Sequence, residues 1–169
     1  TPDSGDDDQG GSTTPSGSVA ATFKLGTDDA TKTNENAQGA QSQDGADAGT
    51  SYSETNNGYT LKLTGMSKVY KNSYDAKGNA CLKLGSSKAA GTFTVTVPDD
   101  VTSVKIYVAG YKSNTGKFTV GGKSYSTVKK SANGEYDEIT IDTSSTKTFT
   151  FTTVSGGWRV KINTIEFYK

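Results

Sequence analysis

Apolar and polar residues alternate in one short stretch after another from Thr92 to Lys169. Alternation with a period of two is typical of a β-strand that has one buried and one solvated face. Strands of this kind, separated by turn residues, predict an all-β protein folded as an antiparallel β-sandwich. The six stretches read T-F-T-V-T-V-P, V-K-I-Y-V-A, G-K-F-T-V-G-G, E-I-T-I-D, K-T-F-T-F-T and W-R-V-K-I-N-T-I-E-F.

The last of these stretches changes its alternation partway along. Val160 and Ile162 share one face, whereas Ile165 and Phe167 share a face at a spacing that does not continue it. Because side chains alternate strictly along a strand, one extra residue is needed between the two halves. The pattern therefore predicts a β-bulge at Asn163-Thr164.

The polar N-terminal third divides into two parts. Residues 1–18 contain four Asp, no Lys or Arg, and no large apolar residue, which predicts a flexible acidic tether. The β-sandwich domain is expected to span 19–169 and to begin with a strand at 19–25. A long polar loop is expected at about 26–58, with a short helix near Asp29–Asn36 within it; a mobile insertion is the alternative.

Three side chains illustrate what the core is expected to contain. Phe149 and Phe151 share one parity in a strand flanked by threonines, so both should be buried. Cys81 is the only cysteine, so it cannot form an intramolecular disulfide. It stands in the apolar run A-C-L-K-L and is expected to be a small buried hydrophobic residue.

The absence of histidine narrows the chemistry. The chain has no His at all, which excludes a Ser-His-Asp triad and any zinc site that contains histidine. Carboxylate catalysis needs two acids that face each other across a cleft. Asp137 and Glu138 are adjacent on an expected strand and so point to opposite faces, and Asp142 does not complete a pair. We therefore expect that the chain is not an enzyme and has no cofactor.

Calcium is the metal that the sequence suggests. The segment D-G-A-D-A-G, from Asp44 to Gly49, spaces its acids as some calcium loops do. It lacks the complete ligand run and the closing Glu of an EF-hand loop. A structural calcium therefore remains an alternative to no metal.

Charge is balanced overall but unevenly distributed. The formal net charge is zero, yet residues 59–169 carry sixteen bases and eight acids. A basic part can bind a polyanion, or it can be neutralised by the acidic N-terminal part; we favour the second interpretation, and nucleic acid is not an expected partner. No stretch is long and apolar enough to span a membrane. The chain begins at Thr1, as a mature or trimmed protein would, and a monomer is expected.

The order of strands and turns over roughly residues 80–169 is similar to that of galactose-binding-like jelly rolls. The matching runs are G-T-F-T-V-T-V-P, V-K-I-Y-V-A-G-Y-K, G-K-F-T-V-G-G-K, T-F-T-F-T and R-V-K-I-N-T-I-E-F. This fold is common in carbohydrate-binding modules and in accessory modules of gut bacterial surface proteins. The resemblance implies a jelly-roll β-sandwich that binds sugars through loops at one edge, often with a structural calcium.

A second resemblance concerns the N-terminal segment. Asp3 and the run Asp6-Asp7-Asp8 resemble the acidic stretch that follows the lipidated cysteine in surface lipoproteins of Bacteroidetes. It implies export to the cell surface, with a lipid anchor upstream of Thr1. A plain interdomain linker is the alternative.

Sugar binding requires an aromatic platform for C–H faces and polar groups for hydroxyls. Trp158 and Tyr111 are the candidate platforms because both lie next to expected loops, with Arg159 and Asn114 as hydroxyl partners. The parity that Trp158 shares with Val160 argues instead for a place in the core.

A second candidate surface lies on the outward parity of two strands. Lys105 and Tyr107 share it in one strand, and Arg159 and Lys161 share it in the last strand. If the strands are neighbours, these residues form a basic, aromatic surface for an acidic glycan or a nucleic-acid backbone. Ordinary solvated charge on a sheet face is the alternative.

These observations support three functions. The first is a non-catalytic glycan-binding module of an exported bacterial cell-surface protein. The second is a structural or adhesive spacer module without a small ligand, and the third is a polyanion-binding module. A concave surface with exposed aromatic residues favours the first, whereas a featureless polar surface favours the second.

Overall fold

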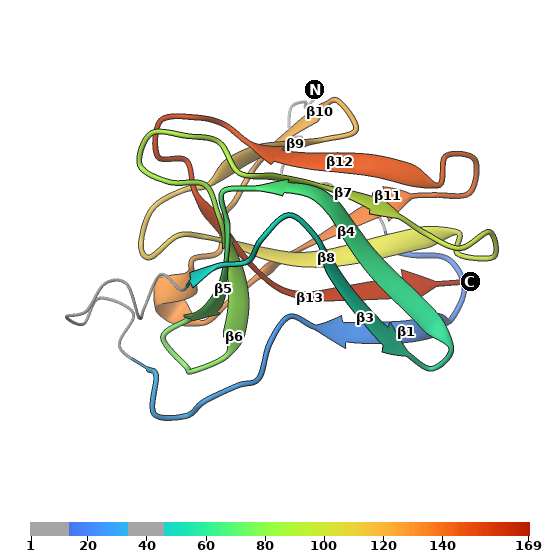
Figure 1. The fold of residues 1–169 in the computed structure, drawn as a ribbon, viewed down its shortest axis with the longest axis horizontal. Coiled ribbons are helices and arrows are strands. Elements are labelled where there is room, and N and C mark those ends of the chain that lie inside the picture. The colour runs from blue at the N-terminus through green and yellow to red at the C-terminus, as the bar shows by residue number, and fades with distance from the viewer. Residues whose placement is uncertain (1–13, 34–45) are drawn as a thin grey trace, which may run out of the picture.

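The protein folds as two antiparallel β-sheets packed face to face (Figure 1). This is the all-β sandwich that the alternation predicts and that the resemblance to jelly rolls implies. The structure is a computed structural model, and it describes residues 14–33 and 46–169. Within these residues the helical content is one short 3₁₀ turn, η1 (Ser131–Asn133).

The first sheet contains the last strand of the chain at its centre. Its strand order is β11-β8-β13-β6-β5-β2, and β1 pairs with the other half of β13. The strands are β1 (Val19–Lys24), β2 (Ala46–Asp47), β5 (Val69–Tyr74), β6 (Ala80–Leu84), β8 (Ser103–Gly110), β11 (Asp137–Asp142) and β13 (Val160–Tyr168).

The second sheet has the strand order β10-β9-β12-β7-β4-β3. Its strands are β3 (Tyr52–Asn56), β4 (Tyr59–Ser67), β7 (Thr92–Thr96), β9 (Lys117–Val120), β10 (Lys123–Ser126) and β12 (Thr148–Thr153). Threonines pair across its outer face, for example Thr94 with Thr150 at 2.9 Å. The polar half of each alternating stretch thus forms cross-strand hydrogen bonds on the solvated face.

An aromatic stack forms part of the core between the sheets. The ring centroid of Phe151 lies 5.2 Å from that of Phe93 and 4.5 Å from that of Phe118, with nearly parallel rings. Phe151 has no exposed surface, and Phe149 is buried at 7% exposure. The predicted burial of both residues is confirmed.

The predicted bulge is also confirmed. The register between β13 and β8 shifts between Ile162 and Thr164, so Asn163 is the extra residue. Its side-chain amide donates to the carbonyl oxygen of Ala80 at 2.9 Å, which connects the bulge to the start of β6. After the shift, Ile165 faces the core again with no exposed surface.

The prediction of one long polar loop at about 26–58 is wrong for its described part. It contains β2 and β3, and β3 pairs with β4 in the register Tyr52↔Leu63. An edge strand with one solvated face needs few apolar residues, which is why the polar sequence concealed it. Asp29 opens a turn, accepting from the backbone N–H of Thr31 at 2.9 Å. The rest of the expected helix and the loop lies at 34–45, outside the described residues.

The two ends of the sandwich domain lie side by side. The backbone N–H of Ser18 donates to the carbonyl of Lys169 at 3.1 Å, and the N–H of Lys169 donates back at 3.1 Å. The C-terminus lies at the right in Figure 1, and the loops that follow β6, β8 and β12 gather at the opposite, left end. Most of the expected tether, residues 1–13, lies outside the described residues.

Candidate functional site

Three loops at one end of the sandwich surround an open depression. They are residues 85–91 between β6 and β7, 111–116 between β8 and β9, and 154–159 between β12 and β13. The depression has a volume of about 490 Å³ and is lined by Ser87, Asn114, Thr115, Gly156, Gly157, Trp158 and Arg159. The structure therefore brings together three of the residues that the sequence suggested for sugar binding.

Backbone hydrogen bonds fix the last two of these loops to each other. The N–H of Tyr111 donates to the carbonyl of Arg159 at 3.2 Å, and the N–H of Val154 donates to the carbonyl of Lys117 at 2.8 Å. Gly116 permits this close approach, because a Cβ there would lie 2.8 Å from the carbonyl oxygen of Arg159. The depression is thus formed by connected loops instead of independent ones.

Trp158 lies at the surface of the depression with 37% of its area exposed, so the parity argument for a place in the core is wrong. β13 begins at Val160, two residues later, and strand alternation does not extend back to Trp158. Gly156 and Gly157 precede it with φ of 94° and 92°, a left-handed conformation that other residues rarely adopt. The ammonium group of Lys117 lies 4.1 Å from the centroid of its ring system.

Tyr111 lies beneath the depression and presents no open ring face. Its exposure is 3%, and the guanidinium carbon of Arg159 lies 4.1 Å above its ring centroid. The structure thus places Tyr111 as the support of Arg159 instead of as a stacking platform. The Nε atom of Arg159 is buried without a hydrogen-bond partner. Asn114, on the same loop as Tyr111, is exposed.

Lys105 and Tyr107 lie elsewhere, on β8. Lys105 lies six positions before Tyr111 along an extended chain, which corresponds to about 20 Å. The Lys105 ammonium pairs with Glu138 at 2.9 Å, and this hydrogen bond is the main cause that raises the pKa of Lys105. The Tyr107 hydroxyl donates to Glu166 at 2.9 Å. Burial, followed by that hydrogen bond, raises the pKa of Tyr107 to about 12.

The expectation that Lys161 contributes to an exposed surface is wrong, although its side chain lies on the outward side of β13 as parity predicts. Its side chain has no exposed surface, and its ammonium donates to the carbonyl of Tyr74 at 2.6 Å. The ammonium also lies 5.5 Å from the ring centroid of Tyr111. The loop after β8 and the end of β5 cover this part of the sheet. The continuous basic, aromatic surface expected from parity is therefore interrupted between Lys105 and Arg159.

The three acids considered for catalysis each contact a different partner. Asp137 accepts a hydrogen bond from the backbone N–H of Val128 at 2.7 Å. Glu138 pairs with Lys105, and Asp142 accepts from the hydroxyl of Ser144 at 2.6 Å. None of the three lines the depression at the loop end.

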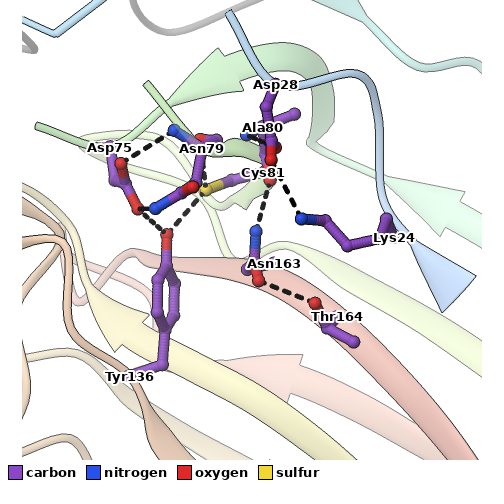
Figure 2. A network of polar contacts seen from close by, with 9 residues as sticks. All are labelled: Lys24, Asp28, Asp75, Asn79, Ala80, Cys81, Tyr136, Asn163 and Thr164. Carbon is purple, nitrogen blue, oxygen red and sulfur yellow. Dashed lines mark hydrogen bonds and ion pairs between the residues drawn. The ribbon is translucent and has the colours of Figure 1, made fainter. Parts of the chain in front are cut away.

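A second polar cluster is closed to solvent (Figure 2). Asp75 and Cys81 have no exposed surface, so the predicted burial of Cys81 is confirmed. The Cys81 sulfur lies 3.0 Å from the hydroxyl of Tyr136, and the amide of Asn79 donates to Asp75 at 2.9 Å. The enclosure of the thiol and the carboxyl group gives the cluster a role in fixing the β5–β6 turn.

The described residues contain no group of three or more His, Cys, Asp and Glu side chains placed to hold a metal ion. Asp44, which opens the calcium segment suggested by the sequence, lies outside them. Asp47 accepts a hydrogen bond from the backbone N–H of Gly49 at 2.8 Å. Because Asp44 is the first ligand expected for calcium, the calcium prediction stays untested.

Sequence reasoning missed Ser87, Thr115 and Lys117. Ser87 and Thr115 stand in segments that read only as turns, and Lys117 is one base among many. The proximity of Thr115 and Lys117 to Trp158 follows from the pairing of β9 with β12, and that of Ser87 follows from the pairing of β7 with β12. No local pattern in the sequence carries that information.

No family model matches the chain, and no curated protein matches it. Solved structures that match include the CBM36-1 domain of a multidomain xylanase from the hindgut metagenome of Trinervitermes trinervoides. It is 14% identical, with a TM-score of 0.36, over 62% of this chain and 89% of that chain. Another is a carbohydrate-binding module, CBM36, in complex with calcium and xylotriose. It is 18% identical, with a TM-score of 0.38, over 70% of this chain and 98% of that chain. Similarity at this level does not extend to binding residues or ligands.

Proposed function

We propose that this chain is a non-catalytic glycan-binding module and that Trp158 is its stacking platform. The observation that carries the proposal is the exposure of Trp158, at 37%, on the wall of a depression of about 490 Å³. Among the described aromatic residues it is the most exposed. A large aromatic surface left in water at a concave site is typical of a binding site.

The other lining residues supply the polar contacts that a sugar needs. Asn114 offers an amide that can both donate and accept, and Ser87 offers a hydroxyl. Arg159 offers guanidinium donors next to Trp158 in sequence. A pyranose ring stacked on exposed indole surface would direct its hydroxyls toward these groups, which is the division of roles found in small-molecule sites.

The position of the depression relative to the two ends of the sandwich supports a binding role over a spacer role. Ser18 and Lys169 are hydrogen-bonded to each other, so both ends of the sandwich lie at one pole. The loops that carry the lining residues of the depression lie at the opposite end (Figure 1). A module attached through residue 18 would therefore present Trp158 away from its attachment, whereas an end-to-end spacer needs its two ends at opposite poles.

We extend the proposal to cellular context. The module belongs to an exported protein of a bacterial cell surface, attached by a lipid anchor upstream of Thr1, as the acidic run at residues 6–8 suggests. Within the described residues, no helix has the length and apolar character needed to cross a membrane. Protease treatment of intact cells of the source organism tests this: the domain should be released from the surface, and its retention inside the cell would contradict the assignment.

Binding is tested on a glycan array followed by calorimetry with the best ligand. Trp158→Ala should reduce affinity at least about tenfold, because one buried aromatic contact dominates a small interface. Val154→Ala is the matched control, since Val154 is an exposed apolar residue of the same loop, at 42% exposure, and does not line the depression. If no glycan binds at millimolar concentration, the spacer function replaces this one.

A further inference from the structure

We propose that the depression selects sugars that carry a negative charge, a carboxylate or a sulfate ester, and that Arg159 recognises that charge. This inference rests on the proposed glycan-binding function and adds a ligand class to it. The neighbouring Trp158 holds the sugar ring, and the guanidinium of Arg159 receives the acidic substituent.

The first argument is local charge. The three loops around the depression and the first residue of β9 contain Lys88, Lys112, Lys117 and Arg159, and they contain no Asp or Glu. The whole chain has a formal net charge of zero. The concentration of cations is therefore a property of these segments, and it attracts anions to the depression.

The second argument is that no carboxylate of the described residues forms an ion pair with these cations. The ion pairs between described residues that the structure shows are Lys24–Asp28 and Lys105–Glu138, neither of which belongs to the three loops. Three of the four cations lie on aromatic rings instead: Arg159 and Lys112 over Tyr111, at 4.1 Å and 5.2 Å, and Lys117 over Trp158, at 4.1 Å. An aromatic face holds a cation in place and leaves its positive charge uncompensated.

The third argument is the fixed orientation of Arg159. Its guanidinium carbon lies 4.1 Å from the ring centroid of Tyr111, and its Nε atom is enclosed without a partner. Its stem packs against Gly85, where a Cβ would lie 3.3 Å from the Cγ of Arg159. A guanidinium held in this way is preorganised to form the parallel hydrogen bonds that carboxylate and sulfate oxygens accept, and little side-chain entropy remains to be lost on binding.

The arrangement fits a sugar better than a nucleic acid. Binding of a single-stranded nucleic acid uses successive aromatic platforms along a cationic groove. Here one exposed aromatic residue stands beside one fixed guanidinium, since Tyr111 is buried at 3% exposure and Lys161 has no exposed surface. A single sugar ring with one charged substituent matches this pairing of one aromatic residue with one guanidinium.

The experiment is a glycan array that carries neutral, uronic-acid-containing, sialylated and sulfated glycans, read at low ionic strength. Binders should be concentrated among the charged glycans, and the separate carboxylate and sulfate arms identify the group. Calorimetry then compares the best charged glycan with its neutral counterpart. Affinity for the charged glycan should be at least about tenfold higher and should fall as salt is added.

Variants assign the preference to Arg159. Arg159→Gln should lower affinity for the charged glycan about tenfold and for its neutral counterpart less than about twofold. Arg159→Lys keeps the positive charge but loses the paired donors of the planar guanidinium. Its affinity for the charged glycan should lie between those of the wild type and Arg159→Gln. Lys62→Gln is the control, because it removes an equal charge from an exposed position on β4 outside the three loops. A thermal melt of each variant verifies that it is folded.

The possible failures are distinguishable. If neutral and charged glycans bind equally well and Arg159→Gln changes neither, charge selection is overturned while glycan binding stands. If no glycan binds, both proposals are overturned. If single-stranded DNA binds more tightly than every glycan, the chain is a polyanion-binding module and both proposals are likewise overturned.

Discussion

The hydroxyl of Tyr136 donates a hydrogen bond of 2.6 Å to Oδ2 of Asp75, a residue 61 positions earlier in the chain (Figure 2). Asp75 is fully buried, and its other oxygen accepts from the backbone N–H of Lys77 at 2.8 Å. The contact joins the β5–β6 turn to the segment after η1. A buried carboxyl group with several donors holds a turn in one conformation, and removing a donor leaves it undersatisfied.

Stability should fall at alkaline pH because of Tyr136. Burial, and then the neighbouring Cys81 and Asp75, raise the pKa of Tyr136 far above the usual 10.0. The unfolded chain loses this proton near pH 10 and the folded chain retains it, so the contribution of Tyr136 is complete below pH 10 and declines above it. The slope is about 1.4 kcal/mol per pH unit for one group.

Urea unfolding between pH 7 and 11.5 measures this dependence. Tyr136→Phe should flatten the alkaline decline and should also cost about 1–3 kcal/mol at pH 7, because Asp75 loses a donor. Tyr59→Phe is the comparison, since the Tyr59 hydroxyl meets Asp100 at the surface, at 2.6 Å, and should have a smaller effect at pH 7. An alkaline slope unchanged in Tyr136→Phe would contradict the assignment.

Truncation of Phe151 should be the more damaging of the two phenylalanine substitutions in β12. Phe151 has no exposed surface and stacks on both Phe93 and Phe118. Phe151→Ala should cost about 3–5 kcal/mol of unfolding free energy in urea melts. Phe149→Ala should cost less, because Phe149 lines an open pocket at the sandwich edge. Equal losses for the two variants would mean that the edge pocket is closed in solution.

Strand parity predicted the core correctly where strands are regular. Phe149, Phe151 and the bulge at Asn163 follow from alternation alone, because a period of two is a local property of the backbone. β3 was missed because an edge strand with polar residues on its open face has no apolar signature. The alternation predicts which face a side chain has within a strand, and it does not predict which strands are at the edge.

The site was predicted only in part, for a related reason. Trp158, Arg159 and Asn114 were selected as loop-proximal residues, and the structure brings them to one depression. The exposure of Trp158 depends on where β13 begins, and the burial of Tyr111 depends on the side chain of Arg159 that covers it. Both facts arise from contacts between segments distant in sequence, which a periodic pattern does not contain.

Gly116→Ala should destabilise the loop end of the sandwich. A Cβ at this position would meet the Val160 side chain and would lie 2.8 Å from the carbonyl of Arg159, so the loop must shift. The expected cost is about 1–3 kcal/mol, as for other overpacking changes. Ser113→Ala, at an exposed position of the same loop, should stay within about 0.5 kcal/mol of the wild type. Thermal or urea unfolding of the two variants decides, and a neutral Gly116→Ala would show that the two loops are not in close contact.

Removing Trp158 should leave the fold nearly intact. Trp158 precedes β13, is 37% exposed, and contacts the Lys117 ammonium at its ring, so its truncation opens no enclosed cavity. Trp158→Ala should therefore cost about 1 kcal/mol or less, against about 3–5 kcal/mol for an aromatic residue in the core. Urea melts of Trp158→Ala and Phe151→Ala, recorded side by side by circular dichroism, measure the contrast. A loss as large as that of Phe151→Ala would place the indole in the core and would remove the platform on which the proposed sugar binding depends.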